Sequence, residues 1–242
     1  MTRADQFLVE QGYAKSRAEA QAAIKAGLVQ VDGQTLTKSS KPVTMEAVIA
    51  YQPPHDFVSR GGVKLAAALD QFRLDAEGRV ALDVGASTGG FSQVLLQSGA
   101  IKVYAVDVGH DQMHPVLARD PRIVRRDGVN ARNLSRNEVP EIVTAITLDV
   151  SFIGLKLVLP PVMALAGQGA WMVALVKPQF EVGRDGLSKG GIVRDEELRD
   201  ASLAGIEEFI GAQAGWKVEG RMESPIAGGD GNREFLVAAL RS

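Results

Sequence analysis

The sequence predicts an α/β protein in which a mostly parallel sheet, covered by helices on both faces, follows a small α+β unit. The main observation is that strand-like apolar runs alternate with helical stretches beyond about residue 58, a pattern typical of parallel sheets. A second is that 45% of the 242 residues are apolar, which is enough for a hydrophobic core. A third is that the first 50 residues follow another pattern, an alanine-rich helix and then a hairpin.

The amino-terminal unit is expected to span residues 1–50, with a linker at residues 51–58. Ser16 begins a capping box in SRAE, and the helix that follows should end at Gly27. The stretch LVQVDGQTLT alternates around Asp32-Gly33, a dipeptide typical of two-residue hairpin turns. Pro53-Pro54 in YQPPHD marks the linker.

The second segment, residues 59–242, carries the parallel-sheet pattern. Its strand-like runs are RVALDV, KVYAVDV, RIV, AITLDV, GAWMVALV, WKVEGRME and REFLVAAL. Helical stretches such as GGFSQVLLQSG and DEELRDASLAGIEEFIGAQAG separate them. The sequence has no internal repeat of fixed period and no low-complexity tract, so we expect one larger domain here.

The composition excludes several classes of site. The chain has no cysteine, which removes disulfides, thiolate metal sites and a cysteine nucleophile. Its formal net charge of −2 argues against a protein coated in positive charge, although it permits local basic patches. The first residues, MTRADQFLVE, lack the apolar region of a secretory signal, and no run of about 18 apolar residues predicts a spanning helix. We therefore expect a cytoplasmic protein without a membrane partner.

A glycine-rich turn is the first candidate for a ligand site. LDVGASTGGF, residues 82–91, lies between a buried strand and an amphipathic helix, where glycines let the backbone approach a ligand. Gly85 is followed by Gly89 and Gly90, so the spacing is not the dinucleotide fingerprint G-x-G-x-x-G. By itself, such a turn is equally compatible with a purely structural role.

Carboxylates near the ends of successive strands favour a ligand. Asp107 ends YAVDV about 20 residues beyond the glycines, where a carboxylate can accept both hydroxyls of a ribose. Asp127 follows the next short strand and Asp149 ends AITLDV, so that with Asp83 four successive strands finish at an acid. Because the carboxyl ends of parallel strands meet at one edge, these acids predict a site for a nucleoside-type cofactor.

Two lysines and one further acid join these carboxylates as candidate catalytic residues. The apolar run WMVALV ends at Lys177, although lysine is among the side chains least often fully buried. Lys64 lies in SRGGVKL ahead of the first strand of this segment, and Glu234 opens the last strand in GNREFLVAAL. A lone lysine at a strand end most often reaches solvent or pairs with an acid. Among several acids and a second lysine, we interpret Lys177 as catalytic.

Six motifs in order resemble the TlyA family of ribosomal RNA ribose methyltransferases, within the FtsJ-like group of 2′-O-methyltransferases. They are SRGGVKL, DVGASTGGF, LDVSFIGL, LVKPQFE, KGGIVRD and SPIAGGDGNREFL. The resemblance implies a Rossmann-like methyltransferase fold with a seven-stranded sheet, and S-adenosylmethionine as the cofactor. It implies a Lys-Asp-Lys-Glu tetrad that corresponds to Lys64, Asp149, Lys177 and Glu234. The amino-terminal unit resembles the small RNA-binding domain of ribosomal protein S-four.

The resemblance also implies which residues bind the cofactor. The first motif and the acids that follow it supply them: Asp83, Gly85, Ala86, Ser87, Thr88, Gly89, Gly90, Phe91, Asp107, Val108, Asp127, Gly128 and Asp149.

The implied reaction is methylation of ribose 2′-hydroxyls in ribosomal RNA, at cytidine in the small or large subunit. A hydroxyl is a poor nucleophile until its proton leaves, so a base is needed. We expect Lys177 to be that base, Lys64 to grip the substrate, and the carboxylates to orient both. Burial and a second ammonium favour the neutral amine, whereas neighbouring carboxylates favour the ammonium, so which lysine accepts the proton stays open. Alignment of the reacting atoms can contribute roughly 7–11 kcal/mol.

Candidate RNA contacts come from both segments. Residues 118–136 contain six arginines and two aspartates, and arginine suits bidentate contacts to phosphate. Any one of these arginines is equally compatible with an ordinary solvated surface. The residues that we expect to contact RNA are Arg3, Lys15, Arg17, Lys25, Arg60, Arg125 and Arg132. The expected partner is ribosomal RNA or a ribosomal subunit, and the oligomeric state stays open.

No metal site is expected, because the three histidines lack zinc-ligand spacing. Two other functions stay open beside the enzyme. One is a non-catalytic RNA-binding or ribosome-assembly protein, which the intact tetrad disfavours. The other is a membrane-active protein, since members of this family have carried a haemolysin label, but no amphipathic segment supports direct lysis.

Overall fold

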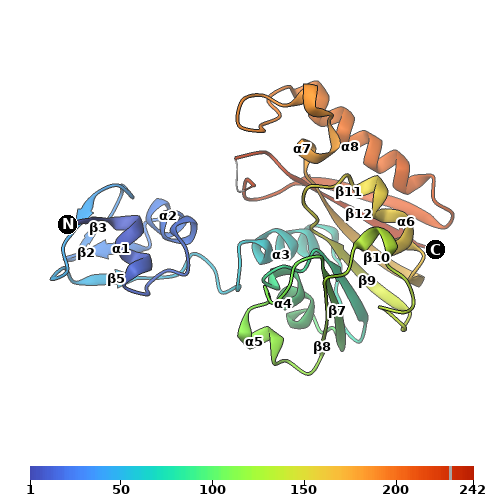
Figure 1. The fold of residues 1–242 in the computed structure, drawn as a ribbon, viewed down its shortest axis with the longest axis horizontal. Helices are drawn as coiled ribbons and strands as arrows, with labels where there is room; N and C mark the ends of the chain where they lie inside the picture. The colour runs from blue at the N-terminus through green and yellow to red at the C-terminus, as the bar shows by residue number, and fades with distance from the viewer. Residues whose placement is uncertain (229–230) are drawn as a thin grey trace. The chain divides into compact units, whose positions relative to one another are not determined.

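The computed structural model describes residues 1–228 and 231–242. Gly229 and Asp230, in the SPIAGGDGNREFL motif, lie outside the described residues. The chain forms two compact units, Met1–Asp56 and Phe57–Ser242 (Figure 1).

The smaller unit packs two helices against short antiparallel strands. Helices α1 (Ala4–Glu10) and α2 (Arg17–Lys25) share an apolar core with a sheet of order β3-β2-β5. Its strands are β2 (Val29–Val31), β3 (Gln34–Thr35) and β5 (Ile49–Tyr51), while β1 (Thr2–Arg3) pairs with β4 (Pro42–Val43).

Local signals in this unit act as the sequence predicts. Ser16 is the N-cap of α2, and its Oγ accepts a hydrogen bond from the backbone N–H of Glu19 at 3.2 Å. Gly27 follows the end of α2 with φ of 73°, which suits a residue without Cβ. Asp32 and Gly33 turn the hairpin between β2 and β3 with φ of 51° and 78°.

The larger unit contains a seven-stranded sheet of order β11-β12-β10-β9-β6-β7-β8, which confirms the predicted fold class. Only β12 runs against its neighbours in the described ladders, pairing antiparallel with both β10 and β11. The strands are β6 (Val80–Val84), β7 (Lys102–Asp107), β8 (Ile123–Asp127), β9 (Val143–Leu148), β10 (Ala166–Val176), β11 (Trp216–Glu223) and β12 (Phe235–Arg241).

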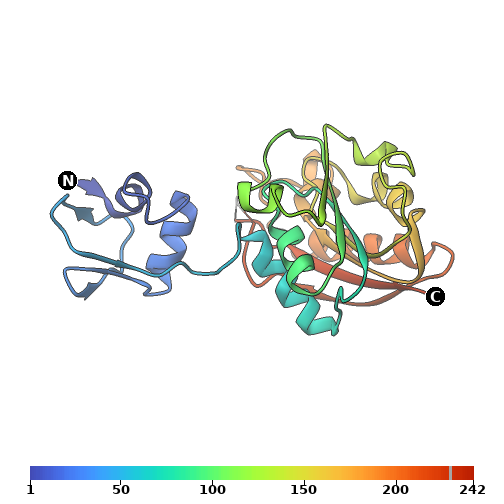
Figure 2. The same cartoon turned by 90° about the horizontal axis from the view of Figure 1, so that it is seen from below.

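Helices cover both faces of this sheet (Figure 2). On one face, α3 (Gly61–Phe72), α4 (Gly90–Gln97) and α5 (Pro115–Ala118) contribute to one apolar cluster. On the other, α6 (Leu159–Met163) and α8 (Glu196–Gly211) contribute to a second. The buried strand β10 shows why both faces need cover: Trp171 and Val173 belong to the first cluster, and Met172 and Ala174 to the second. The helix α7 (Pro178–Glu181) and the 3-10 helices η1 (Ala131–Asn133), η2 (Leu155–Leu157) and η3 (Arg184–Gly186) lie in the connections.

Candidate active site

Three separated segments meet at one edge of the large sheet. Strands β9 and β10 are parallel neighbours, so Asp149 and Lys177, which directly follow them, emerge at the same edge. Strand β12 runs antiparallel to β10 with Phe235 opposite Val176. Glu234, just before β12, therefore lies next to Lys177.

The glycine turn after β6 is seated against this edge. Gly85 has φ of +84°, and a Cβ there would lie 2.3 Å from the carbonyl oxygen of Asp149. Its N–H donates to the carbonyl of Val106 in β7 at 2.8 Å. The turn thus touches the ends of both neighbouring strands, and only glycine fits its first position.

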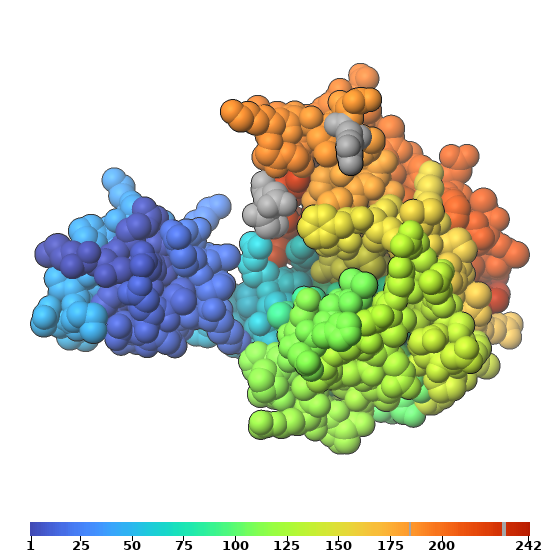
Figure 3. Space-filling view, viewed as in Figure 1, coloured from blue at the N-terminus to red at the C-terminus, as the bar shows by residue number. Residues whose placement is uncertain are grey.

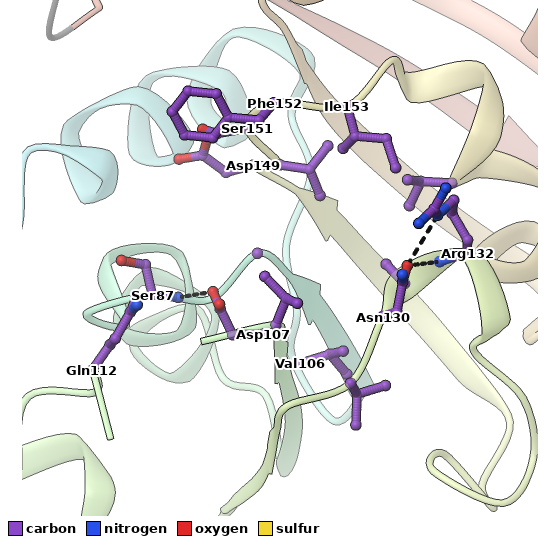
Figure 4. Close-up of a pocket in the computed structure, with 16 residues that line it drawn as sticks. Ser87, Val106, Asp107, Gln112, Asn130, Arg132, Asp149, Ser151, Phe152 and Ile153 are labelled. Carbon is purple, nitrogen blue, oxygen red and sulfur yellow. Dashed lines mark hydrogen bonds between the residues drawn. The ribbon is translucent and has the colours of Figure 1, made fainter. Parts of the chain in front are cut away.

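A pocket of about 500 Å³ runs along the same edge (Figure 4). Its walls come from the glycine turn, the end of β7, and the loops that follow β8 and β9. The polar and aromatic groups on its walls include Ser87, Asp107, Gln112, Asn130, Arg132 and Phe152. This volume lies within the range of about 300–1,000 Å³ that is usual for small-molecule sites.

Asp107 is held by the backbone in a way that leaves acceptor capacity. One carboxylate oxygen accepts from the N–H of Ser87 at 2.8 Å, and the other from the N–H of Gly109 at 2.7 Å. A carboxylate has about four lone-pair sites, so about two stay available to hydroxyls of a ligand in the pocket. Val108 follows with 71% of its surface exposed, an apolar wall beside the carboxylate.

A smaller pocket of about 250 Å³ shares Gly85, Ser87 and Asp149 with the larger one. Its other walls come from the start of α3 and the start of α4, and they carry Arg60 and Lys64. In the space-filling view of this unit, the cyan segment at its start lies recessed between the green and the orange segments (Figure 3). Because they share these three lining residues, the two pockets adjoin at the glycine turn and Asp149.

Two ion pairs, one buried and one partly buried, flank the smaller pocket. Lys64 Nζ lies 2.5 Å from Glu234 Oε2, and Lys177 Nζ lies 2.6 Å from Asp149 Oδ1. One member of each pair, Lys64 and Asp149, lines this pocket. The four side chains that the sequence nominates as a tetrad are thus brought together, and pairing makes the burial of their charges tolerable.

Asp83 has a different environment from the other acids. It lies inside β6, its surface is 0% exposed, and it lines neither pocket. Its carboxylate accepts hydrogen bonds from Ser92 Oγ at 2.6 Å and Thr147 Oγ1 at 3.0 Å. Burial raises the pKa of Asp83 to about 6, and these two hydrogen bonds oppose the rise. Asp83 therefore ties α4 and β9 to β6, while the rim carries Asp107, Asp127 and Asp149.

Asp127 lies on the rim but outside both pockets. It forms an ion pair with Arg125, which lowers the pKa of Asp127 mainly through a side-chain hydrogen bond. Its carboxylate also accepts from the N–H of Asp111 at 3.0 Å. Gly128 leaves space for the ring of His110, which a Cβ would meet at 2.8 Å. These residues shape the loop that leads into the wall at Val129 and Asn130.

Most arginines of residues 118–136 are engaged within the chain. Arg122 pairs with Asp120, and Arg125 pairs with Asp111 and Asp127. Arg126 and Arg136 donate to backbone carbonyls. Arg132 lines the larger pocket, and its Nε donates to Asn130 Oδ1 at 3.3 Å.

The cations of the smaller unit divide in a similar way. Arg3 and Arg17 both bond to the buried carboxylate of Asp5, and Arg3 holds the pKa of that carboxyl well below its usual range. Lys15 and Lys25 are exposed.

Sequence reasoning did not single out several pocket residues. Ser59, Gln112, Val129, Asn130, Ser151 and Ile153 line the two pockets, yet none belongs to a charged pattern. All lie in loops beside strand ends or the start of α3. Ser59, Ser151 and Ile153 belong to the motifs SRGGVKL and LDVSFIGL, and for the others the available signal was the rule that ligands bind beyond the carboxyl ends of parallel strands. In the part of the chain that the structure describes, no group of three or more His, Asp and Glu is placed to hold a metal ion. Among the same residues, no helix has the length and apolar character needed to cross a bilayer.

Comparison with known proteins gives two family matches. The family model of FtsJ-like methyltransferases matches residues 57–241, and that of the S4 domain matches residues 2–49. A 16S/23S rRNA (cytidine-2′-O)-methyltransferase, TlyA of Mycobacterium tuberculosis, is 40% identical over 97% of this chain and 88% of its own length. Hemolysin A of Brachyspira hyodysenteriae is 38% identical over 97% of this chain and 98% of its own. A solved structure of a candidate hemolysin from Streptococcus thermophilus has a TM-score of 0.78 and 37% identity, covering 99% of this chain and 88% of that one.

Proposed function

The chain belongs to the FtsJ-like methyltransferase family, and from this premise we propose that it transfers a methyl group from S-adenosylmethionine to a cytidine 2′-hydroxyl in ribosomal RNA. The observation that carries the proposal is the set of two ion pairs, the buried Lys64–Glu234 and the partly buried Lys177–Asp149, around one pocket. The relative from Mycobacterium tuberculosis is named for cytidine 2′-O-methylation of 16S and 23S rRNA, and the S4 match supports an RNA substrate. A ribosomal substrate places the proposed site of action in the cytoplasm.

The larger pocket suits the adenosine end of the cofactor. Asp107 retains acceptor capacity for the two ribose hydroxyls, which is the usual role of an acid at this strand end. Val108 and Ile153 supply apolar surface for a purine on the same walls. The residues present therefore fit a nucleoside, and no phosphate-binding fingerprint is needed.

The amino-acid end of the cofactor would lie toward the smaller pocket. Lys64 complements a carboxylate there, and Asp149 complements an ammonium. When bound, S-adenosylmethionine supplies a methyl group on a positively charged sulfur, which is a good electrophile. Because Asp149 and Gly85 line both pockets, the reactive centre is expected at their junction.

Lys177 is our choice for the proton acceptor. Its Nζ pairs with Asp149, which lines both pockets, and its side chain is only 10% exposed. In its neutral form it would take the proton of the ribose hydroxyl as that oxygen attacks the methyl group. The cofactor would supply the methyl and leave as a neutral thioether, and the lysine would end protonated beside the 2′-O-methyl ribose. Lys64, fixed by Glu234, would hold the substrate or cofactor by its charge.

RNA contacts are proposed for both units. Arg60 lies on the wall of the smaller pocket, where it can reach a phosphate of the target nucleotide. In the S4 unit, Lys15 and Lys25 are exposed and Arg3 and Arg17 retain exposed side chains at 48% and 56%. Phe152 is 91% exposed at the pocket wall, where it offers a stacking surface for an unpaired base.

The test is methyl transfer to ribosomal particles that lack the modification. Methyl-labelled cofactor is supplied to the purified chain, and the label is mapped on the RNA. Label on a cytidine 2′-oxygen is expected. Intact cofactor and RNA binding without any transfer would instead identify a non-catalytic RNA-binding protein.

The matched lysine variants test the assignment of the base. Lys177→Ala should lower the rate by about 10²–10⁴-fold, the usual contribution of a general base. Lys217→Ala removes an exposed lysine that pairs only with Glu219 among the described residues, so this control should retain the rate. Wild-type transfer by Lys177→Ala would remove Lys177 from this role. A larger loss in Lys64→Ala, with cofactor affinity unchanged, would assign the proton to Lys64.

A further inference from the structure

Lys177 has a second partner besides Asp149. Its Nζ donates a hydrogen bond to Ser151 Oγ at 2.8 Å, while Asp149 Oδ1 lies 2.6 Å from the same nitrogen. The two partners are two residues apart in the loop that follows β9. A lysine ammonium has three N–H donors arranged tetrahedrally. The hydrogen bond to Ser151 uses one of them, and the ion pair with Asp149 holds the nitrogen by its charge.

Ser151 contacts both this lysine and the ligand space. It lines the larger pocket together with Asp149, whereas Lys177 lines neither pocket. In the part of the chain that the structure describes, the hydroxyl of Ser151 accepts from Lys177 and donates to no protein group, and the residue is exposed.

Two further contacts join the same two segments. The rings of Phe152 and Phe180 lie 5.1 Å apart between centroids, and the N–H of Leu155 donates to Glu181 Oε1 at 2.8 Å. The loop that carries Ser151 is therefore fastened to α7, which directly follows Lys177, at places other than Ser151 itself. Removal of the Ser151 hydroxyl should leave the loop in place and affect only Lys177.

From these contacts we infer that Ser151 is a positioning residue: its hydrogen bond, together with the ion pair to Asp149, orients Lys177 Nζ toward the ribose hydroxyl. This inference rests on the proposed function, because it concerns the base of that reaction. A base held by an ion pair alone can swing about its partner, and a misplacement of about 1 Å can cost on the order of 10²-fold in rate. A base held by an ion pair and a directional hydrogen bond keeps one orientation.

The experiment compares Ser151→Ala with Ser151→Thr, which retains the hydroxyl. Methyl transfer is measured under single-turnover conditions, together with KM for RNA, affinity for S-adenosylhomocysteine, and thermal stability. Ser151→Ala should lower kcat about tenfold to a hundredfold, with the KM for RNA, the cofactor affinity and Tm unchanged. Ser151→Thr should restore most of the rate. Ser202→Ala removes a hydroxyl bonded only within α8, to the carbonyl of Arg199, and serves as the control.

The outcomes separate this inference from the proposed function. If wild type and Ser151→Ala transfer methyl at the same rate while Lys177→Ala is inactive, the positioning role is overturned and the function stands. If Ser151→Ala and Ser151→Thr lose cofactor affinity equally, Ser151 is only a pocket wall, which also overturns the role. If the wild type transfers no methyl to RNA, the proposed function fails before the variants are compared.

Discussion

Asp83→Asn should change the pH dependence of folding stability in a direction that the structure specifies. The Asp83 carboxyl is fully buried, and burial raises its pKa from 3.8 to about 6. Between these values the native chain binds more protons than the unfolded chain. The free energy of unfolding therefore falls as pH rises through this window, and the loss is complete above about pH 7.

The size of the effect follows from the shift of about two pKa units. At 1.36 kcal/mol per unit, ionised Asp83 destabilises the native state by about 3 kcal/mol at neutral pH. About 2 kcal/mol of this cost develops between about pH 4.5 and pH 7.5. Asparagine has the same size and no charge, and its amide can accept from one of the two hydroxyls and donate to the other, Ser92 or Thr147.

The assay is urea unfolding of the wild type and Asp83→Asn at a series of pH values. Titration of the other acids is common to both proteins and cancels in the difference. Relative to wild type, the variant should gain about 2 kcal/mol between about pH 4.5 and pH 7.5. Asp120→Asn is a control in which the pH dependence has the opposite sign. The hydrogen bond from Arg122 lowers the pKa of Asp120, so in the wild type the ionised carboxylate stabilises the native state and this stabilisation is lost as pH falls. A difference between Asp83→Asn and wild type that does not change with pH would refute the reasoning.

Three further predictions concern the pocket walls. Gly85→Ala places a Cβ 2.3 Å from a carbonyl oxygen at a φ of +84°, so chemical denaturation should show that the free energy of unfolding falls by at least about 3 kcal/mol. In the control Gly78→Ala, φ is +67° and the space is open, so the free energy of unfolding should fall by only about 1 kcal/mol. Asp107→Asn should weaken S-adenosylhomocysteine binding, measured by calorimetry, at least about tenfold, because a charged acceptor is lost. Asp127 lies outside both pockets, so Asp127→Asn should bind this ligand nearly as the wild type does. Equal losses of affinity in the two variants would contradict the assignment of Asp107 to the ribose. Phe152→Gly relieves a backbone φ of 63° but removes the contact of the exposed ring with Phe180, so Tm should change little while methyl transfer to RNA falls. Unchanged transfer would exclude a role of this ring in substrate binding.

Elements that depend on near neighbours in the sequence were predictable. The hairpin at Asp32-Gly33 and the cap at Ser16 each rest on residues within a few positions. The alternation of apolar strands and helices likewise predicted the mixed sheet, because a strand buried on both faces must be apolar throughout.

The environments of individual side chains were less predictable. Asp83 belongs to a motif of pocket residues, yet its position inside β6 turns its carboxylate toward Ser92 of α4 rather than toward the rim. Arg125 and Arg132 look alike in sequence, but one is paired with two aspartates and the other lines a pocket. These differences depend on which groups the fold places beside each side chain, and local sequence patterns do not show those neighbours.

The sequence by itself determined the order of the elements, the glycine turn and the chemical types available at the strand ends, because caps, turns and apolar periodicity are local properties of the chain. Only the tertiary structure decided the pairing of these groups. The ion pair of Lys64 and Glu234 joins residues 170 positions apart, and the bond from Lys177 to Ser151 spans 26. Such contacts follow from strand order and register, which bring distant segments to one edge of the sheet.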